Sequence, residues 1–339
     1  MSNADNDRGP LGATLARAMK LLVTGIAGFI GSHLAERLLA RGDTVVGLDS
    51  FDPFYPRAAK EKNLEGIRAH ESARVIEGDI LDEALVDEIF REGGFDAVVH
   101  LAGLAGVRPS LGAPARYQRV NVEGTTRLAE AALAHGVRRF VFASSSSVYG
   151  ASARAPFAES ERADEPLSPY AASKRSAELV LRSLVHVRGL GVTVLRYFTV
   201  YGPRQRPEMA IHAFCRAIDQ SRPIPIHGSG SASRDYTYVG DAVSGTVSAI
   251  DRIDEGFRIY NLGGGSQPTT LFQLVTHLSR ALGKPARIEH RPEVVGDVQH
   301  TVADISAARE ALGYAPEVDI REGIARFVAW YREHGAAGE

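Results

Sequence analysis

The sequence has very little cysteine, no long apolar run and almost no net charge. Its single cysteine, Cys215, excludes an intramolecular disulfide and any cysteine-cluster metal site, and it fits a reducing compartment such as the cytoplasm. No stretch approaches the roughly 20 apolar residues that a membrane-spanning helix needs, so we expect no membrane partner. The formal net charge of −2 gives no support for nucleic-acid binding.

Metal-binding patterns are also missing from the chain. No grouping of histidines and carboxylates has the spacing of a metal site, so we expect no metal. His33 and His100 stand inside an expected helix and at an expected strand end, where packing explains them. The polar opening, residues 1–18, has no apolar core and is expected to be a flexible extension rather than a signal peptide.

What the sequence does contain is a regular alternation of short apolar runs with amphipathic stretches. Such alternation predicts an α/β protein with a doubly wound parallel sheet and helices on both faces. We place the first domain at residues 19–198, with about 238–264 returning to it. A smaller C-terminal α/β domain is expected from 199–237 and 265–339. The runs rich in β-branched residues are 20–25, 44–49, 73–79, 95–102, 137–144, 191–198 and 257–264.

The first predicted strand leads directly into the glycine-rich stretch GIAGFIG, which opens a helix. Here Gly25 permits a tight turn, Gly28 a close backbone approach to a pyrophosphate, and Gly31 close packing of helix on sheet. Asp49 ends the second strand, where a carboxylate can accept both ribose hydroxyls and repels a 2′-phosphate. This pattern predicts a Rossmann-type site for NAD rather than NADP.

The ends of later strands complete the expected cofactor site. EGD (77–79) and HLAG (100–103) follow the next two strands and are expected to line the adenine and nicotinamide-ribose sides. The expected NAD contacts are Gly25, Gly28, Phe29, Ile30, Gly31, Asp49, Asp79, Ile80, Leu101, Ala102, Gly103, Tyr170, Lys174 and Tyr197.

A tyrosine and a lysine in SPYAASK (168–174) form the expected catalytic pair. Their spacing of four places Tyr170 and Lys174 on one helical face. A cation about 4 Å away at an effective dielectric near 20 supplies roughly 4 kcal/mol. Lys174, helped by the positive nicotinamide ring, is therefore expected to bring the pKa of Tyr170 near neutrality. Tyr170 would then exchange a proton with a substrate hydroxyl that Ser145 of ASSSSVYG also holds.

With these motifs in family order, the chain resembles the extended short-chain dehydrogenase/reductase family, specifically its nucleotide-sugar epimerases and dehydratases. The resemblance covers about residues 20–334 and rests on GIAGFIG, HLAG, SSSSVYG, YAASK, LRYFTVYGPRQRP and SRDYTYVGD. It implies a catalytic trio of Ser145, Tyr170 and Lys174, with Asn121 as a structural or cofactor-side residue. It also implies tightly held NAD and a homodimer built on a four-helix bundle.

The serine run narrows the reaction. Relatives that dehydrate the sugar carry an Asp-Glu pair where this chain has Ser146 and Ser147, and those that decarboxylate UDP-glucuronate carry Glu at the place of Ser147. Without these carboxylates, the remaining chemistry is hydride removal from carbon 4, rotation of the 4-keto sugar and hydride return to its other face. The expected activity is a 4-epimerisation.

The stretch FTVYGPRQRPEM indicates which sugar is bound. With Thr199 and Arg206 it looks like the corresponding stretch of UDP-glucuronate 4-epimerases, in which an arginine meets the sugar carboxylate. Arg234 matches the family's diphosphate-binding arginine, and Ile226 is expected in an added edge strand beside the uracil (IPIH, 224–227). The expected substrate contacts are Ser146, Ser147, Thr199, Arg206, Ile226, Arg234 and Asp297, the last of which belongs to a Gly-Asp pair. One departure is Val294, at which many relatives have an arginine; Arg291 lies upstream.

The leading reading is thus an NAD-dependent UDP-glucuronate 4-epimerase that makes UDP-galacturonate. A UDP-glucose or UDP-N-acetylglucosamine 4-epimerase is the alternative, and its mark would be activity on a neutral hexose. A decarboxylase or a 4,6-dehydratase is disfavoured by Ser146 and Ser147. A non-catalytic NAD sensor is disfavoured by the intact catalytic trio, because a sensor does not need a tuned phenol.

Overall fold

The structure is a computed structural model, and it describes residues 17–151, 153–253, 255–265, 267–292 and 300–335. The expected flexible extension therefore lies almost entirely outside the described residues. Within the described residues, no helix combines the length and apolar character required to cross a membrane.

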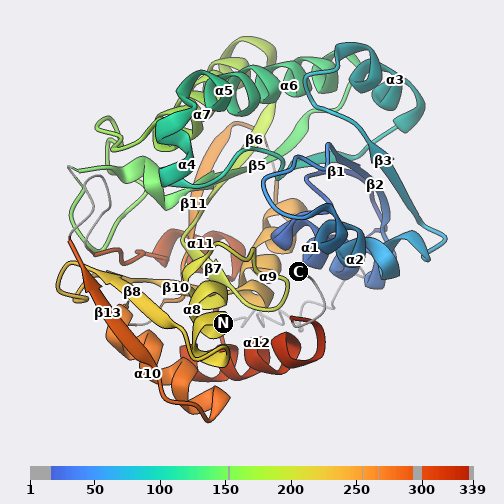
Figure 1. Ribbon diagram of the computed structural model, residues 1–339. Helices are drawn as coiled ribbons and strands as arrows, with labels where there is room; N and C mark the ends of the chain where they lie inside the picture. Colours follow the sequence, from blue (N-terminus) through green and yellow to red (C-terminus); the bar gives the residue numbers. More distant parts are fainter. Residues whose placement is uncertain (1–16, 152, 254, 266, 293–299, 336–339) are drawn as a thin grey trace, which may run out of the picture.

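A seven-stranded parallel sheet forms the centre of the molecule (Figure 1). Its strand order is β11-β6-β5-β4-β1-β2-β3. Successive strands are added on one side of β1 up to β3 and on its other side from β4 onward, as in a doubly wound fold. Each apolar run predicted from the sequence supplies one strand, so the predicted sheet is confirmed. The strands are β1 (Lys20–Thr24), β2 (Thr44–Asp49), β3 (Ala73–Glu77), β4 (Ala97–His100), β5 (Arg139–Ser145), β6 (Gly191–Tyr197) and β11 (Phe257–Leu262).

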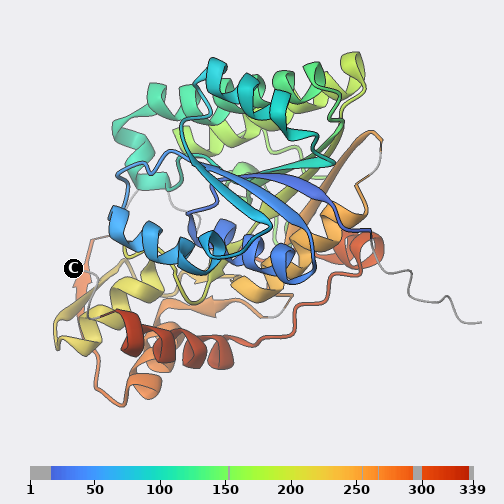
Figure 2. The same ribbon diagram turned by 90° about the vertical axis from the view of Figure 1, so that its right-hand side faces the viewer.

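Helices cover both faces of this sheet, and Figure 2 shows the sheet between two helical layers. Two hydrophobic clusters, one on each face, fill the space between sheet and helices. One layer contains α1 (Phe29–Ala40), α2 (Arg57–Arg68), α9 (Val239–Asp251) and α11 (Ser306–Leu312). The other contains α3 (Glu83–Gly93), α6 (Gly124–Ala134) and α7 (Pro169–Arg188). Three short helical segments lie beside α7: α4 (Val107–Gly112), α5 (Pro114–Gln118) and the π-helix η1 (Arg119–Glu123).

A third hydrophobic cluster holds together the smaller part of the molecule, below the sheet in Figure 1. It includes Cys215 and the side chain of Ile226, both fully buried. The expected edge strand at 224–227 forms, but it pairs with β13 in a separate parallel sheet and does not extend the central one. The elements are α8 (Ala210–Asp219), α10 (Leu271–Leu282) and α12 (Ile320–His334), with strand pairs β8 (Pro223–His227) and β13 (Arg287–Arg291), β7 (Thr199–Tyr201) and β10 (Tyr236–Tyr238), and β9 (Ser233–Arg234) and β12 (Thr269–Thr270).

Candidate active site

A pocket of about 410 Å³ opens at the carboxyl ends of the parallel strands, where doubly wound sheets bind their ligands. It also reaches β7 and the loop before α8. Most of the residues predicted to form the site line this one pocket. They are Gly25, Gly28, Phe29, Ile30, Gly31, Asp49, Asp79, Ile80, Leu101, Ala102, Gly103, Ser145, Ser146, Ser147, Tyr170, Lys174, Tyr197, Thr199 and Arg206.

The glycine-rich turn leaves no room for a side chain at Gly25 or Gly31. Gly25 has a φ of +74°, and a Cβ there would lie 2.7 Å from the amide nitrogen of Ala102. A Cβ on Gly31 would lie 2.1 Å from the carbonyl oxygen of Gly25. The amino end of α1 therefore lies directly against the turn, with its unpaired backbone N–H groups at the pocket, which suits a pyrophosphate.

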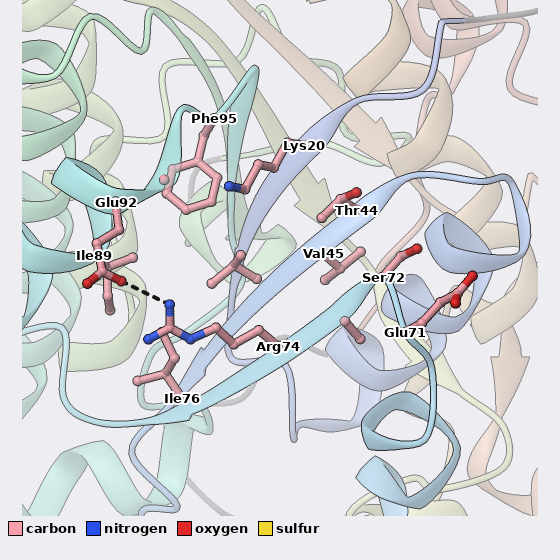
Figure 3. A pocket seen from close by; sticks show the side chains of 13 residues that line it. Lys20, Thr44, Val45, Glu71, Ser72, Arg74, Ile76, Ile89, Glu92 and Phe95 are labelled. Carbon is pink, nitrogen blue, oxygen red and sulfur yellow. Dashed lines mark hydrogen bonds and ion pairs between the residues drawn. The ribbon is translucent and has the colours of Figure 1, made fainter.

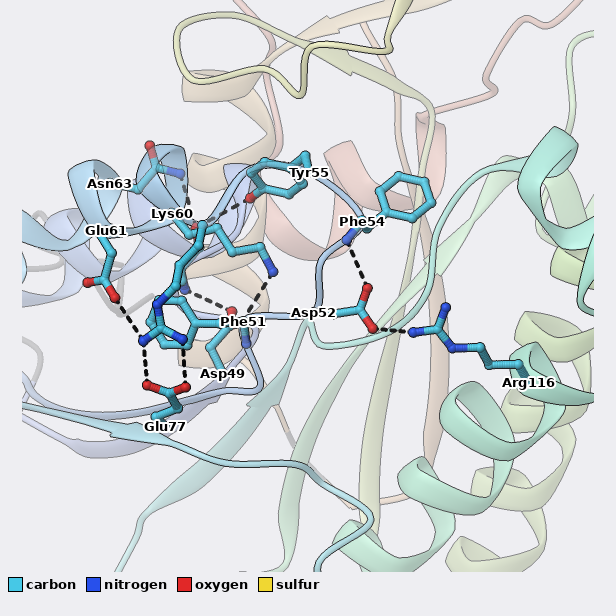
Figure 4. A network of polar contacts seen from close by, with 12 residues as sticks. Asp49, Phe51, Asp52, Phe54, Tyr55, Lys60, Glu61, Asn63, Glu77 and Arg116 are labelled. Carbon is cyan, nitrogen blue, oxygen red and sulfur yellow. Dashed lines mark hydrogen bonds and ion pairs between the residues drawn. The ribbon is translucent and has the colours of Figure 1, made fainter. Parts of the chain in front are cut away.

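Asp49, at the end of β2, lies in a network of polar contacts (Figure 4). Its carboxylate accepts hydrogen bonds from the amides of Ala27, at 3.1 Å, and Phe51, at 2.8 Å. Lys60 of α2 lies 3.6 Å away and is buried with it. Asp49 thus connects the glycine-rich turn to the loop after β2 as well as facing the pocket. Lys60 also lines the pocket, although nothing in the sequence distinguishes it from an exposed helical lysine.

Asn121 does not line the pocket but fixes two segments that do. Its Oδ1 accepts from the amide of Leu104 at 2.8 Å, and its Nδ2 donates to the carbonyl of Leu104 at 3.0 Å. Nδ2 also donates to the hydroxyl of Ser173 at 2.9 Å. This side chain therefore joins the loop after β4 to the helix that carries Tyr170 and Lys174.

His100 is part of a buried hydrogen-bond chain beside the same loop. Thr125 donates its hydroxyl proton to the carbonyl of Asn121 at 2.6 Å, so it must accept from Nε2 of His100, at 2.9 Å. Nδ1 of His100 then accepts from Thr24, at 2.7 Å. Burial lowers the pKa of His100 to about 3, so the ring is neutral. Its role is structural, as the sequence analysis expected.

Tyr170 and Lys174 both face the pocket from α7, as their spacing predicted. Burial raises the pKa of the Tyr170 phenol, while hydrogen bonding to Ser145 and the charge of Arg206 act to lower it. The expectation that Lys174, helped by the positive nicotinamide ring, brings the pKa of this phenol near neutrality depends on the bound cofactor and stays a prediction.

Lys174 instead contacts the end of β5. Its Nζ donates to the carbonyl of Ala143 at 2.9 Å and lies 5.0 Å from the ring centre of Phe142. Burial lowers the pKa of Lys174 to about 8, while the charge of Glu178 acts to raise it. Around neutral pH this lysine is a cation held at the base of the pocket.

Glu178 is the central member of a buried network that the sequence did not reveal. Its carboxylate accepts from the hydroxyl of Ser144 at 2.5 Å and from Nη2 and Nε of Arg196 at 2.8 and 3.0 Å. Arg175 donates to it at 2.9 Å. Three elements, β5, β6 and α7, are thereby joined directly beneath the serine run.

The serine run itself forms a tight turn at the end of β5. The hydroxyl of Ser145 accepts from the amide of Ser147 at 3.2 Å, and the two hydroxyls lie 3.2 Å apart. Thr199, at the start of β7, is held by its amide, which donates to the carbonyl of Asp235 at 3.1 Å. These contacts leave the lining of this part of the pocket rich in hydroxyl groups.

Arg206 reaches the pocket from the loop after β7. Its Nε lies 3.1 Å from the carboxylate of Glu208, and its guanidinium lies 5.3 Å from the ring centre of Phe54. The sequence singled out Arg206, but it gave no indication of these two partners. Phe54 belongs to the loop after β2, far away in the chain.

Two of the predicted substrate contacts, Ile226 and Arg234, are not brought into the pocket lining, and a third lies outside the described residues. Ile226 points into the core of the smaller part. Arg234 is half-buried on β9 and donates to the carbonyl of Ser233 at 3.0 Å. Asp297 lies outside the described residues, as does Val294, while Arg291 is exposed on β13 beside Glu289.

A second pocket, of about 350 Å³, lies at the amino ends of β1, β2 and β3 (Figure 3). Lys20, Thr44 and Ala73 start these strands, and an ion pair between Arg74 and Glu92 crosses the pocket at 2.9 Å. The residues predicted for catalysis and cofactor binding all lie at the opposite ends of the strands.

Comparison with known proteins agrees with the site. Residues 21–263 match the model of the NAD dependent epimerase/dehydratase family. A curated UDP-glucuronate 4-epimerase of Thermodesulfobacterium geofontis is 41% identical over 92% of this chain and 96% of its own. The chain also resembles two solved structures over 93% and 95% of its length and 99% of theirs. They are a Bacillus cereus UDP-glucuronic acid 4-epimerase in complex with UDP-glucuronic acid and NAD, with 35% identity and a TM-score of 0.86, and a Streptomyces venezuelae dTDP-glucose 4,6-dehydratase with NAD and TYD bound, with 34% identity and a TM-score of 0.87. The resemblance seen in the sequence is confirmed, and the chain belongs to the NAD dependent epimerase/dehydratase family.

Proposed function

We propose that this protein catalyses the NAD-dependent 4-epimerisation of UDP-glucuronate to UDP-galacturonate through a 4-keto intermediate. The observation that carries the proposal is the composition of the pocket at the ends of β5, β6 and β7. Tyr170, Ser145 and Arg206 line it together. Among the described lining residues, every carboxylate lies at the end of β2 or in the loops after β2 and β3, on the side expected to hold the cofactor.

Each member of the catalytic trio has a distinct task. Tyr170 takes the proton from the hydroxyl on carbon 4 and later returns it, and Ser145 holds the same oxygen by a hydrogen bond. Lys174 supplies a fixed positive charge at the base of the pocket. Bound NAD supplies a reversible two-electron oxidation of that carbon. Because the oxidation is reversed within the cycle, only the configuration of carbon 4 changes.

In this proposal the reaction stops at epimerisation because the described lining residues offer no carboxylate beside the ketone. Elimination of water and promoted loss of CO₂ both need a carboxylate at the positions of Ser146 or Ser147. The 4,6-dehydratase and the 4-epimerase resemble this chain equally well in overall structure. The hydroxyl-rich turn after β5 therefore carries the distinction, and the fold does not.

A uronic acid is the substrate that best uses Arg206. A guanidinium can bind a carboxylate through two parallel hydrogen bonds, and Thr199 offers a hydroxyl nearby in the lining. Holding the carboxylate also keeps the C–CO₂ bond of the keto acid out of the alignment that favours loss of CO₂. Arg234 and Asp297 remain proposed contacts of the nucleotide diphosphate and nucleoside, and Ile226 can serve the uracil only through its backbone.

The two parts of the chain divide the ligands between them in this proposal. Residues 19–198, with about 238–264, hold NAD through the glycine-rich turn, Asp49 and the loop after β4, which Asn121 fixes from behind. Residues 199–237 and 265–339 hold the UDP-sugar.

The protein is further proposed to be a cytoplasmic homodimer. Leu179 and Val187 of α7 are large apolar side chains that remain exposed, at 50% and 69%. Such positions suit a helical interface between two copies. Light scattering of the purified protein tests the dimer, and a monomer at micromolar concentration would reject it.

Incubation with UDP-glucuronate, UDP-glucose and UDP-N-acetylglucosamine separately, followed by NMR of the products, tests the proposed function. We expect UDP-galacturonate from the first and far slower turnover of the neutral sugars. A pentose or a deoxy sugar as the product would reject epimerisation, and equal turnover of the three would reject the uronate assignment.

A further inference from the structure

Arg206, the proposed partner of the substrate carboxylate, is already paired with a carboxylate of the protein. Glu208 meets its Nε at 3.1 Å, two residues along the same loop. Within the described part of the chain, no other carboxylate forms an ion pair with Arg206. Contact through Nε leaves the two terminal nitrogens of the guanidinium, which are the ones that a second carboxylate can approach side by side.

The same guanidinium also lies over the aromatic ring of Phe54. Phe54 lies 5.3 Å away, within the range of a cation–π contact. The loop that carries Phe54 is held in turn by Asp52, which accepts from the amide of Phe54 at 3.0 Å and pairs with Arg116 (Figure 4). Arg206 is therefore held between Glu208, which pairs with its Nε, and the ring of Phe54.

The geometry of the reaction makes the strength of the grip on the carboxylate important. The carboxyl group stands on carbon 5, next to the reacting carbon 4. When the ketone turns to present its other face, the carboxylate must move with the ring. A guanidinium without a counter-ion would bind the carboxylate most strongly before the turn, and this would raise the barrier to the turn.

We propose that Glu208 is a positioning residue that orients Arg206 and weakens its hold on the sugar carboxylate, so that the 4-keto uronate can turn between the two half-reactions. This rests on the proposed function. Glu208 shares the charge of the guanidinium while leaving its terminal nitrogens directed to the substrate. The residue thereby sets the balance between selecting a uronic acid and releasing it to rotate.

The Glu208→Gln variant separates charge from shape, because glutamine keeps the size of the side chain beside Nε of Arg206 but removes its negative charge. For UDP-glucuronate we expect both KM and kcat to fall about twofold to fivefold, the range of a partly exposed ion pair, so that kcat/KM changes little. For UDP-glucose, which has no carboxylate, neither constant should change more than about twofold. Glu208→Ala also removes the side chain that lies against Nε and helps to orient Arg206, so its KM for UDP-glucuronate should lie above that of Glu208→Gln.

Glu36→Gln is the matched control. Glu36 of α1 pairs with Arg204, which belongs to the same loop as Arg206. The exposed fractions of the Glu36 and Arg204 side chains, 39% and 22%, are close to the 41% and 20% of Glu208 and Arg206. Arg204 does not line the pocket, so the constants for both sugars should stay unchanged in this variant.

The possible failures are distinguishable. Calorimetric titration of each variant with UDP-glucuronate reports binding whether or not turnover follows. Unchanged or weaker binding by Glu208→Gln, or an equal gain for UDP-glucose, would overturn the role of Glu208 while leaving the proposed function intact. If the unmodified protein made no UDP-galacturonate, the proposed function itself would be lost.

Discussion

Glu178 lies one helical turn after Lys174 on α7, and its negative charge acts on a lysine that burial makes hard to protonate. Burial lowers the pKa of Lys174 to about 8, and without Glu178 the pKa would be lower still. Glu178 is itself fully buried and held by Ser144 and Arg196. The ion pair between α7 and β6 thus helps to keep the lysine of the pocket charged at neutral pH.

The first prediction concerns this charge. In Glu178→Gln the pKa of Lys174 should fall further below 8, so the lysine loses its proton at a lower pH. If charged Lys174 is needed for turnover, the alkaline limb of the pH profile of kcat should move to lower pH. Arg196 would be left buried without its carboxylate, which should also lower the free energy of unfolding by about 3–5 kcal/mol.

Glu123→Gln controls for this variant, because it removes an exposed partner of Arg127 at a similar distance of 3.0 Å. Its pH profile and melting temperature should match those of the unmodified protein. An alkaline limb that stays in place in a folded Glu178→Gln variant would contradict the link between the two residues.

The second prediction separates chemistry from cofactor binding. Tyr170→Phe removes the proton-transferring hydroxyl but keeps the ring, which packs edge-on against Tyr117 at 6.2 Å. Turnover should fall by about 10²–10⁴-fold, the usual contribution of a general acid–base group. The NAD content, measured after denaturation, should stay close to that of the unmodified protein. Retained turnover would remove Tyr170 from this role.

The third prediction tests the proposed carboxylate contact. Arg206→Ala should raise KM for UDP-glucuronate about tenfold to a hundredfold, since a hydrogen bond to a charged group contributes about 1.5–3 kcal/mol. KM for UDP-glucose should change far less. Arg222→Ala, which removes an exposed arginine outside the pocket, is the control. Equal effects of Arg206→Ala on the two sugars would reject the contact.

The sequence predicted the sheet and the positions of the cofactor turn well, because both depend on local patterns. Apolar runs alternate with helices, and the spacing of Gly25, Gly28 and Gly31 is itself the signal. The same holds for Tyr170 and Lys174, whose spacing of four fixes a common helical face.

The partners of these residues could not be predicted in the same way. Glu178 reads as an ordinary position on an exposed helix, and only the pairing of β5 with β6 brings Ser144 and Arg196 to it. Phe54 meets Arg206 from a distant loop. The contacts of Lys174 are a further example: spacing along a helix predicts which face Lys174 shares, but it does not predict that its Nζ donates to Ala143.

The last prediction concerns the glycine-rich turn. In Gly31→Ala the new methyl group would lie 2.1 Å from the backbone oxygen of Gly25, which cannot move aside as a side chain can. The amino end of α1 must shift away from the turn, at a cost of about 1–3 kcal/mol from overpacking. Gly66→Ala is the control, because the nearest atom to its Cβ is Oε1 of Glu36 at 4.0 Å, and alanine favours a helix by about 1 kcal/mol.

Melting with and without added NAD distinguishes the two variants. Gly31→Ala should melt lower and lose most of the stabilisation by NAD, while Gly66→Ala should melt at or above the unmodified protein and keep it. Equal stabilisation by NAD in both variants would mean that the cofactor does not depend on the close approach of α1 to this turn.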